Sequence, residues 1–187
     1  SRILLQPLNV LMGQNGGPIR VSESTSRDDE ARPHVAMLPN GGAVVVWEAG
    51  QRKSRNVFVR FLNENGSPIG ATQVVNSFTR GNQDRPNVAV NYKGDVCVTW
   101  ESQYQDGVGD GVYGRRFNAR GIKTGPEIQI NQSIKWSQFN PVITSLIDGR
   151  FIIVWVGEVE QGKQYALAGK QMDEVSVSFM RSKIMGR

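Results

Sequence analysis

Unbroken hydrophobic runs that end in tryptophan recur along the chain. The three segments are PNGGAVVVWE at 39–48, YKGDVCVTWE at 92–101 and IDGRFIIVWV at 147–156, and each starts with a glycine-containing turn. Successive side chains of a β-strand point to opposite faces, so a strand that is apolar at consecutive positions is covered on both faces. The pattern predicts a hairpin in each segment, whose second strand is buried and ends in the tryptophan.

The three segments share one register. Pro33, Pro86 and Pro141 lie 53 and 55 residues apart, and each is followed eight residues later by a glycine and 14 residues later by the tryptophan. Three anchors in one register indicate an internal repeat.

Each repeat unit contains four predicted strands. A strand follows the proline, the tryptophan-ending strand comes second, and a third strand follows a variable loop, as in NVFVRFLN at 56–63 and GVYGRRFN at 111–118. TQVVNS at 72–77 and EIQINQS at 127–133 are the fourth strands, and VSVSFM at 175–180 is the candidate in the last unit. Residues 9–24 resemble a third and a fourth strand, so the chain is expected to begin within a unit.

Four-stranded antiparallel units that are buried on both faces are typical of β-propeller blades packed face to face. We therefore expect one all-β repeat domain, a β-propeller-like array of about three and a half blades. The tryptophans are expected to fill the layers between blades, and a β-sandwich is the competing architecture. The expected units are a partial repeat at 1–31, repeats at 32–84 and 85–139, and a third repeat with a C-terminal tail at 140–187.

The middle unit, RPNVAVNYKGDVCVTWESQYQDGVGDGVYGRRFNARGIKTGPEIQINQS, resembles a tandem repeat of large bacterial surface and secreted proteins. These proteins are adhesin-like and calcium-associated. The resemblance runs through most of residues 9–173. It implies display outside the cell, at the cell surface or in the periplasm, and an adhesion or scaffold role rather than catalysis. Because it concerns a repeat type, it transfers architecture better than function.

Composition narrows the function classes only slightly. The formal net charge is +5 and the sequence pI is about 9.6, but the basic residues are scattered and do not interleave with aromatic residues, so nucleic acid is not expected as a partner. The single cysteine, Cys97, lies in an apolar strand and cannot form an internal disulfide. No window approaches 18 consecutive apolar residues, so no membrane span is predicted. Ser1 is not an initiator methionine, which suggests a processed or excised portion of a longer protein.

The segment QDGVGDGVYG at 105–114 has the most suggestive chemistry. Asp106 and Asp110, with Gln105 and glycine carbonyls, offer oxygen ligands of the kind Ca²⁺ prefers. Calcium is the candidate cofactor, but a full site needs about six to eight oxygens, and a flexible glycine-rich loop is the competing interpretation.

The inventory of catalytic residues is small. His34 is the only histidine, and no nucleophile elbow, phosphate-binding loop or dinucleotide fingerprint is present. A carboxylate pair for glycosidase chemistry would have to come from Glu48, Glu101 or Glu158. The first two follow the repeated tryptophan, which favours a structural place, so the chain is not expected to be an enzyme.

These observations favour a non-catalytic structural or protein-interaction module that assembles with itself, with other subunits or with further repeats. The alternative is a lectin-like module that binds a glycan through loop aromatics such as Tyr104, Tyr113 and Trp136. Arg115 and Arg116 form a small basic cluster and are further candidates for contact with a ligand or partner.

Overall fold

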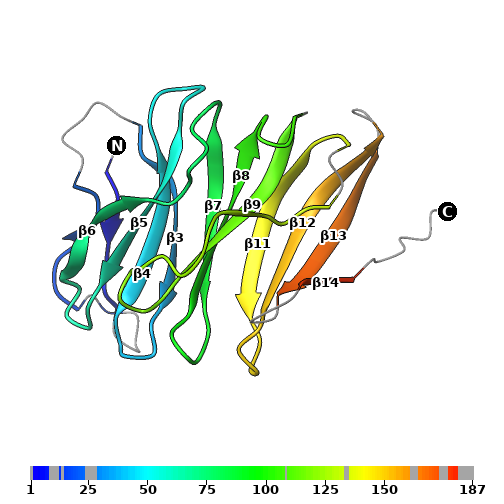
Figure 1. The fold of residues 1–187 in the computed structure, drawn as a ribbon. Helices are drawn as coiled ribbons and strands as arrows, with labels where there is room; N and C mark the ends of the chain where they lie inside the picture. Colours follow the sequence, from blue (N-terminus) through cyan, green and yellow to red (C-terminus); the bar gives the residue numbers. More distant parts are fainter. Residues whose placement is uncertain are drawn as a thin grey trace.

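A computed structural model describes residues 2–8, 13, 15–23, 29–107, 109–132, 135–160, 164–172 and 177–180. In this part of the chain the regular structure is entirely β, with three four-stranded sheets and one two-stranded sheet, all antiparallel. Figure 1 shows the three larger sheets side by side in a row. The predicted all-β, propeller-like architecture is confirmed. None of the described residues forms a helix long and apolar enough to cross a membrane.

We call the larger sheets blades 1, 2 and 3, and their strands follow one another in sequence order across each sheet. The expected unit boundaries fall within the first residues of the first strand of each blade. The strands are β1 (Leu4–Leu5) and β2 (Ile19–Arg20) in the N-terminal hairpin; β3 (Ala31–Met37), β4 (Ala43–Ala49), β5 (Asn56–Leu62) and β6 (Pro68–Val74) in blade 1; β7 (Gln83–Val90), β8 (Val96–Gln103), β9 (Asp110–Phe117) and β10 (Ile128–Gln129) in blade 2; and β11 (Gln138–Ser145), β12 (Phe151–Glu160), β13 (Gln164–Met172) and β14 (Val177–Met180) in blade 3.

The N-terminal hairpin differs from the expectation. Of the two strands expected within residues 9–24, the second is present at Ile19–Arg20, and it pairs with Leu4–Leu5, which precedes the expected segment. Residues 9–12, 14 and 24 lie outside the described part of the chain. The register of the repeat is clear in the three later units, and the N-terminal segment lacks the proline and tryptophan anchors that define it.

The repeated glycine closes the first hairpin of every blade. Gly41, Gly94 and Gly149 have φ angles of 84°, 84° and 92°, and each donates its N–H to the carbonyl three residues earlier. Only glycine adopts this left-handed conformation at little cost, which explains why it recurs at this position.

The tryptophans lie in the layers between sheets, as predicted. Each faces the preceding unit: Trp47 packs with the N-terminal hairpin, Trp100 lies in the core between blades 1 and 2, and Trp155 lies in the core between blades 2 and 3. Their exposed fractions are 2%, 0% and 5%. Aromatic residues of this size supply much of the apolar area that holds one sheet to the next.

A glutamine three residues before the repeated proline holds the indole in blades 2 and 3. Trp100 Nε1 donates to Gln83 Oε1 at 3.2 Å, and Trp155 Nε1 donates to Gln138 Oε1 at 3.0 Å. A buried indole N–H requires an acceptor, so these glutamines complete the layer.

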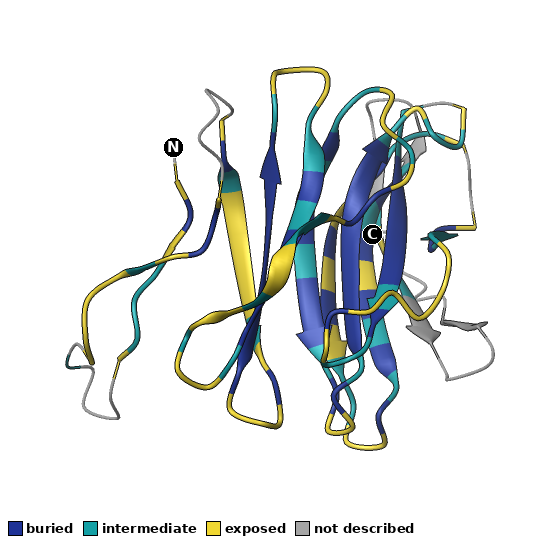
Figure 2. Cartoon of the chain, turned by 60° about the vertical axis from the view of Figure 1, so that its left-hand side comes forward, coloured by how far each residue is buried: buried dark blue, intermediate teal, exposed yellow. Residues whose placement is uncertain are grey.

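The faces of the blades are not equally covered. All of β4 is buried, and β8 is buried except for its last residue, in agreement with the consecutive apolar residues of these strands. In blade 3, Val154 is 38% and Leu167 56% exposed, whereas Val57 and Val112, the counterparts of Leu167, are fully buried. Figure 2 shows the buried strands in the middle of the stack. Within the described residues, blade 3 is therefore covered on one face only.

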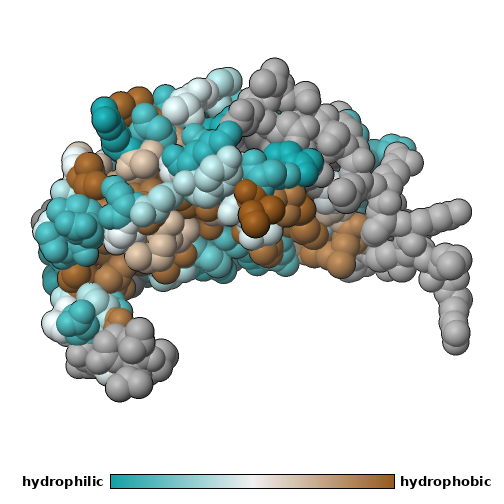
Figure 3. All heavy atoms as spheres, turned by 90° about the horizontal axis from the view of Figure 1, so that it is seen from below, coloured by the Kyte–Doolittle hydropathy of each residue, from teal (hydrophilic) through white to brown (hydrophobic). Residues whose placement is uncertain are grey.

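The first strands of the blades lie against one another, because β7 contacts both β3 and β11. Within the described part of the chain, each of these strands has a hydrogen-bonded neighbour on one side only, so together they form the inner edge of the stack. Figure 3 shows the described residues from below, where their outline is curved. In a propeller the inner strands of the blades flank the central channel.

Gly121→Ala is expected to lower stability by about 1–3 kcal/mol, because an added Cβ would lie 2.9 Å from Cδ2 of the buried Phe61. The matched control is Gly70→Ala, since Gly70 has a similar positive φ of 71°, compared with 78° at Gly121, but has open space around the position of a Cβ. Urea unfolding of both variants measures the difference, and equal losses would contradict close packing between blades 1 and 2.

Candidate functional site

The inner strands share a bulged start at the same end of the stack. The residue before the repeated proline has a positive φ in every blade: 49° at Arg32, 48° at Arg85 and 54° at Asn140. This conformation is costly for residues other than glycine, and a following proline disfavours helical conformations further. Strained backbone of this kind persists only where the surroundings hold it.

Two buried glutamates hold the bulges of blades 2 and 3. Glu48 Oε2 accepts the backbone N–H of Arg85 at 2.8 Å, and Glu101 Oε1 accepts that of Asn140 at 2.5 Å. Their exposed fractions are 0% and 3%. Each glutamate directly follows the repeated tryptophan, so a carboxylate of one blade binds the backbone of the next.

Arginines complete the pairing of these carboxylates. Glu48 forms ion pairs with Arg32, at 2.5 Å, and with Arg55. Glu101 receives two hydrogen bonds from Arg85, at 2.8 and 3.1 Å. Burial raises the pKa of Glu101, and the Asn140 N–H and Arg85 oppose that shift. A buried carboxylate is tolerated when it is paired and hydrogen-bonded in this way.

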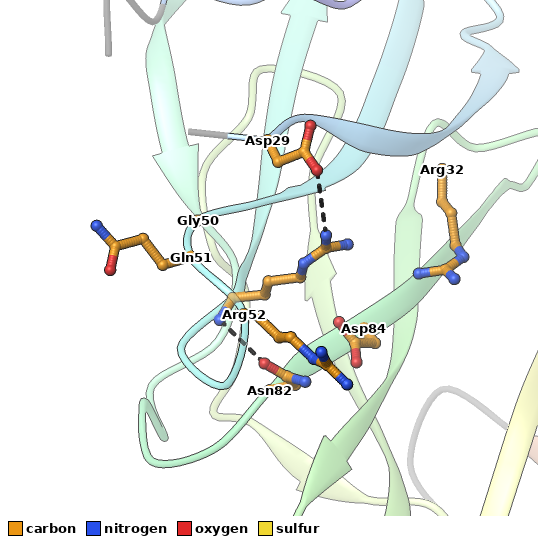
Figure 4. A pocket seen from close by; sticks show the side chains of 8 residues that line it. Asp29, Arg32, Gly50, Gln51, Arg52, Asn82 and Asp84 are labelled. Carbon is orange, nitrogen blue, oxygen red and sulfur yellow. Dashed lines mark hydrogen bonds and ion pairs between the residues drawn. The ribbon is translucent and has the colours of Figure 1, made fainter. Parts of the chain in front are cut away.

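A pocket of about 430 Å³ opens beside Glu48, between blades 1 and 2. Figure 4 shows the side chains that line it. They come from the segment before β3, from β3 itself, from the β4–β5 loop and from the start of blade 2. The lining residues are Asp29, Arg32, Gly50, Gln51, Arg52, Arg55, Asn82 and Asp84.

Asp84 is the unusual member of this lining. Its Oδ1 is buried and accepts no hydrogen bond from any of the described residues. Burial raises the pKa of Asp84, the neighbouring Glu48 carboxylate raises it further, and Arg55, Arg32 and Arg85 lower it. A carboxyl group whose pKa is raised by burial beside a second carboxylate, at the wall of a pocket, is a candidate functional group.

The β4–β5 loop shapes one wall of the pocket. Gly50 has a φ of 127°, and a Cβ at this position would lie 2.9 Å from the carbonyl oxygen of Ser54, so the loop turns tightly here. Arg55 donates its N–H to Asn82 Oδ1 at 3.4 Å, and its guanidinium lies 3.6 Å from Asp29 Oδ2. These contacts tie the loop of blade 1 to the segment that enters blade 2.

A second pocket, of about 730 Å³, lies between the N-terminal hairpin and blade 1. Among the described residues that line it, most are apolar side chains, amides and glycines, and one, the exposed Glu64, is ionisable. The pocket at Asp84 is therefore the stronger candidate for chemistry, although it is smaller.

Of the two aspartates of the expected calcium site, Asp106 lies in the β8–β9 loop of blade 2 and Asp110 is the first residue of β9. Asp106 Oδ2 accepts hydrogen bonds from Gln129 and Asn131 at 3.2 and 3.3 Å. Asp110 occupies the position in β9 that Arg55 has in blade 1, and its pKa is raised by burial, lowered by Arg85 and raised by Asp106. Among the described residues, no group of three or more His, Cys, Asp or Glu side chains could hold a metal ion. Calcium binding stays a prediction.

The residues expected to contact a ligand or partner are not gathered in one site. Tyr104 is 53% exposed on the β8–β9 loop, and Trp136 is half-buried before β11. Arg115 is 5% exposed: its guanidinium donates to the carbonyl of Val75 and to Ser77 Oγ and lies 3.6 Å from Glu127. Arg115 therefore joins blades 1 and 2 and does not face solvent.

Three further residues from the sequence analysis are placed as follows. Arg116 lies 3.9 Å from Asp95. Tyr113 is buried within blade 2. Glu158 Oε2 accepts the N–H of Ser137 at 3.1 Å in blade 3, away from the pocket.

The pocket residues were missed because none belongs to a recognised motif. One signal was available: Asp84 stands two residues before the repeated proline, where the other units have Ala31 and Phe139. The repeat architecture does not require a charged residue at a position that is apolar in the other repeats, so such a residue indicates a different role.

Comparison with known proteins bears on the fold. No model of a known protein family matches the sequence, and no curated protein matches it. A protein of unknown function from Dyadobacter fermentans DSM 18053 has a similar structure (TM-score 0.64, 11% identity), with 85% of this chain and 56% of that protein covered. The Hadza microbial sialidase Hz136 follows (TM-score 0.57, 10% identity), with 78% and 35% covered. A thermostable family-43 glycoside hydrolase is also similar (TM-score 0.53, 8% identity), with 85% and 60% covered.

At these identities the likeness establishes the fold, and the chain spans 35% to 60% of the length of these three proteins. Two of the three are named as a sialidase and a glycoside hydrolase, which contradicts the expected non-catalytic structural or interaction module. The expectation that the chain is not an enzyme is contradicted by the same finding.

Glu48→Gln is expected to lower the free energy of unfolding by about 1–3 kcal/mol, because the neutral amide weakens the pairing with two arginines and with the Arg85 N–H. The exposed Glu64→Gln serves as control and should change stability by less than about 0.5 kcal/mol. Urea unfolding at neutral pH measures both, and equal stability of the two variants would contradict the structural role of Glu48.

Asp84→Asn is expected to raise the melting temperature at pH 7 by about 2–4 °C, the shift for about 1 kcal/mol in a chain of this size. The pKa of Asp84 is raised above its ordinary value of 3.8, so the folded wild-type protein loses stability as pH rises through that raised pKa. The gain of the variant should therefore disappear below about pH 4. Asp148→Asn should show the opposite sign, because Arg150 lowers the pKa of Asp148. A variant of Asp84 that melts lower than wild type at pH 7 would contradict the unfavourable burial of this carboxylate.

Proposed function

We propose that this chain is part of a carbohydrate-active β-propeller, and that the pocket at Asp84 binds a saccharide and hydrolyses its glycosidic bond. The observation that carries the proposal is the Asp84 carboxyl group, which lines an open pocket and whose buried Oδ1 accepts no hydrogen bond from any of the described residues. Buried polar atoms are nearly always hydrogen-bonded, so an orphaned acceptor at a pocket is an appropriate partner for a ligand hydroxyl. Saccharides supply such hydroxyls in abundance.

The electrostatics of the pocket suit the two carboxyl groups that glycoside hydrolysis requires. Asp84, whose pKa is raised, is the proton donor to the glycosidic oxygen. Asp29 lines the same pocket from the segment before β3, and its side chain is 72% exposed. It is the second carboxylate, which takes a proton from the water that attacks the anomeric carbon. The C–O bond to the leaving sugar breaks as this sugar receives the proton of Asp84, so one water is consumed per bond.

Glu48 has a supporting part in this scheme. Its carboxylate is engaged by Arg32, Arg55 and the Arg85 N–H. After burial, the Glu48 carboxylate is the next cause that favours the protonated form of the Asp84 carboxyl group. Glu48 is therefore a positioning residue that tunes Asp84 and does not contact the sugar.

The position of the pocket also supports the proposal. It lies where inner strands of two blades begin, near the expected axis of a propeller, and proteins named as a sialidase and a glycoside hydrolase share this fold. Surface display, an adhesin-type role and calcium dependence, which the repeat resemblance implies, stay predictions beside it.

The test is hydrolysis of a panel of aryl glycosides and polysaccharides by the 187-residue chain. The reaction is measured as release of the aryl group or of reducing ends. Wild type is expected to cleave at least one substrate, and Asp84→Asn to lower kcat about 10²–10⁴-fold, as expected for loss of a general acid. Binding of the same substrate should persist in this variant. Glu64→Gln, outside the pocket, should retain wild-type activity. Absence of any cleavage or binding by wild type, or full activity of Asp84→Asn, would overturn the proposal.

A further inference from the structure

The arginines around the pocket differ in how they are paired. Arg32 and Arg55 share the Glu48 carboxylate, and Arg85 pairs with Glu101. Arg52 lines the pocket from the exposed tip of the β4–β5 loop and has no ion pair or hydrogen bond with any of the described residues. The pocket thus presents one unpaired cation and, at Asp84, one unpaired acceptor.

We infer that the saccharide taken by this pocket carries a carboxylate, which Arg52 binds while a hydroxyl of the same sugar donates to Asp84. This inference rests on the proposed function and specifies its substrate class. A planar guanidinium matches a carboxylate with two parallel hydrogen bonds, an interaction that a neutral hydroxymethyl group cannot form.

Arg32 is placed to assist Arg52. One of its terminal nitrogens is held by Glu48 at 2.5 Å, but its side chain is 48% exposed at the pocket. Figure 4 shows Arg32 and Asp84 approaching the pocket from neighbouring strands. The remaining donors of Arg32 are available to the same anionic sugar.

The balance of charge selects a singly charged anion. Asp29 and Asp84 line the same pocket as the arginines, and Glu48 already takes up much of the charge of Arg32 and Arg55. A doubly charged phosphate would face the Asp29 and Glu48 carboxylates with one unpaired cation to compensate it. A uronic or sialic acid carries a single charge together with the hydroxyls that Asp84 requires.

The experiment compares matched sugars by isothermal titration calorimetry with the 187-residue chain. Methyl glucuronide and methyl glucoside differ only in a carboxylate against a hydroxymethyl group, and methyl galacturonide and methyl galactoside form a second such pair. A methyl sialoside distinguishes sialic from uronic acids. Wild type is expected to bind at least one acidic sugar at least about tenfold more tightly than its neutral partner, the factor for a charge-assisted hydrogen bond.

Arg52→Gln should lower the affinity for the acidic sugar about tenfold and leave the affinity for the neutral partner unchanged. Lys53→Gln is the control, because it removes the same charge from the same exposed loop at a residue that does not line the pocket. Its effect should be much smaller. Equal losses of affinity for the acidic sugar in both variants would show a general electrostatic attraction to the loop, and this result would overturn a site at Arg52.

The outcomes separate the inference from the proposed function. If acidic and neutral sugars bind equally and Arg52→Gln changes neither, the inference fails while a saccharide site at Asp84 stands. If none of these sugars binds and the glycoside panel is not cleaved, both fail.

Discussion

The arrangement of this protein depends on the pairing of buried carboxylates with the backbone of a neighbouring sheet. Glu48 and Glu101 are removed from water, and each must find several donors to remain charged there. They find them in an N–H at the bulge of the next blade and in guanidiniums on either side. Apolar layers with their tryptophans hold the sheets together, but they are non-directional. The carboxylates fix where one inner strand begins relative to the previous blade.

The pocket results from the same pairing of Glu48 with its neighbours. Because Glu48 gathers Arg32 and Arg55, these side chains form the wall of a cavity instead of extending into solvent. Because it also holds the bulge at Arg85, the preceding residue, Asp84, is placed partly out of water and near the Glu48 carboxylate. Its raised pKa follows from these two facts. The same contacts that stabilise the stack leave Asp84 Oδ1 among the buried polar atoms that have no hydrogen-bond partner in the described residues.

The sequence predicted the features that recur and missed those that do not. The consecutive apolar residues and the glycine at each first hairpin give the strands of three blades, and the tryptophans lie in the layers where the register puts them. The repeat also places Glu48 and Glu101 at equivalent positions. It could not show that Arg32 of β3 and Arg55 of the β4–β5 loop converge on the same carboxylate, because they meet only once β3 and β5 are both paired with β4. The pairing of the Trp100 indole with Gln83 depends on tertiary packing in the same way. In the sequence, Asp84 differs from the apolar residues at the same position of the other repeats, and this is its one signal. Arg115, which was a candidate for contact with a ligand or partner, is buried between two blades.

The hydrogen bonds that these glutamates form between blades all run in one direction along the chain. Glu48 of blade 1 binds the backbone of blade 2, and Glu101 of blade 2 binds that of blade 3. In blade 3 the equivalent position is Val156, so the series of carboxylates ends there. The geometry at the start of β7 and of β11 thus depends on the blade before it, and a sequence change in blade 1 affects residues that belong to blade 2. The environment of Asp84 in blade 2 therefore depends on Glu48 in blade 1. Substitutions in the two blades are expected to affect each other, even though the repeat assigns these residues to different units.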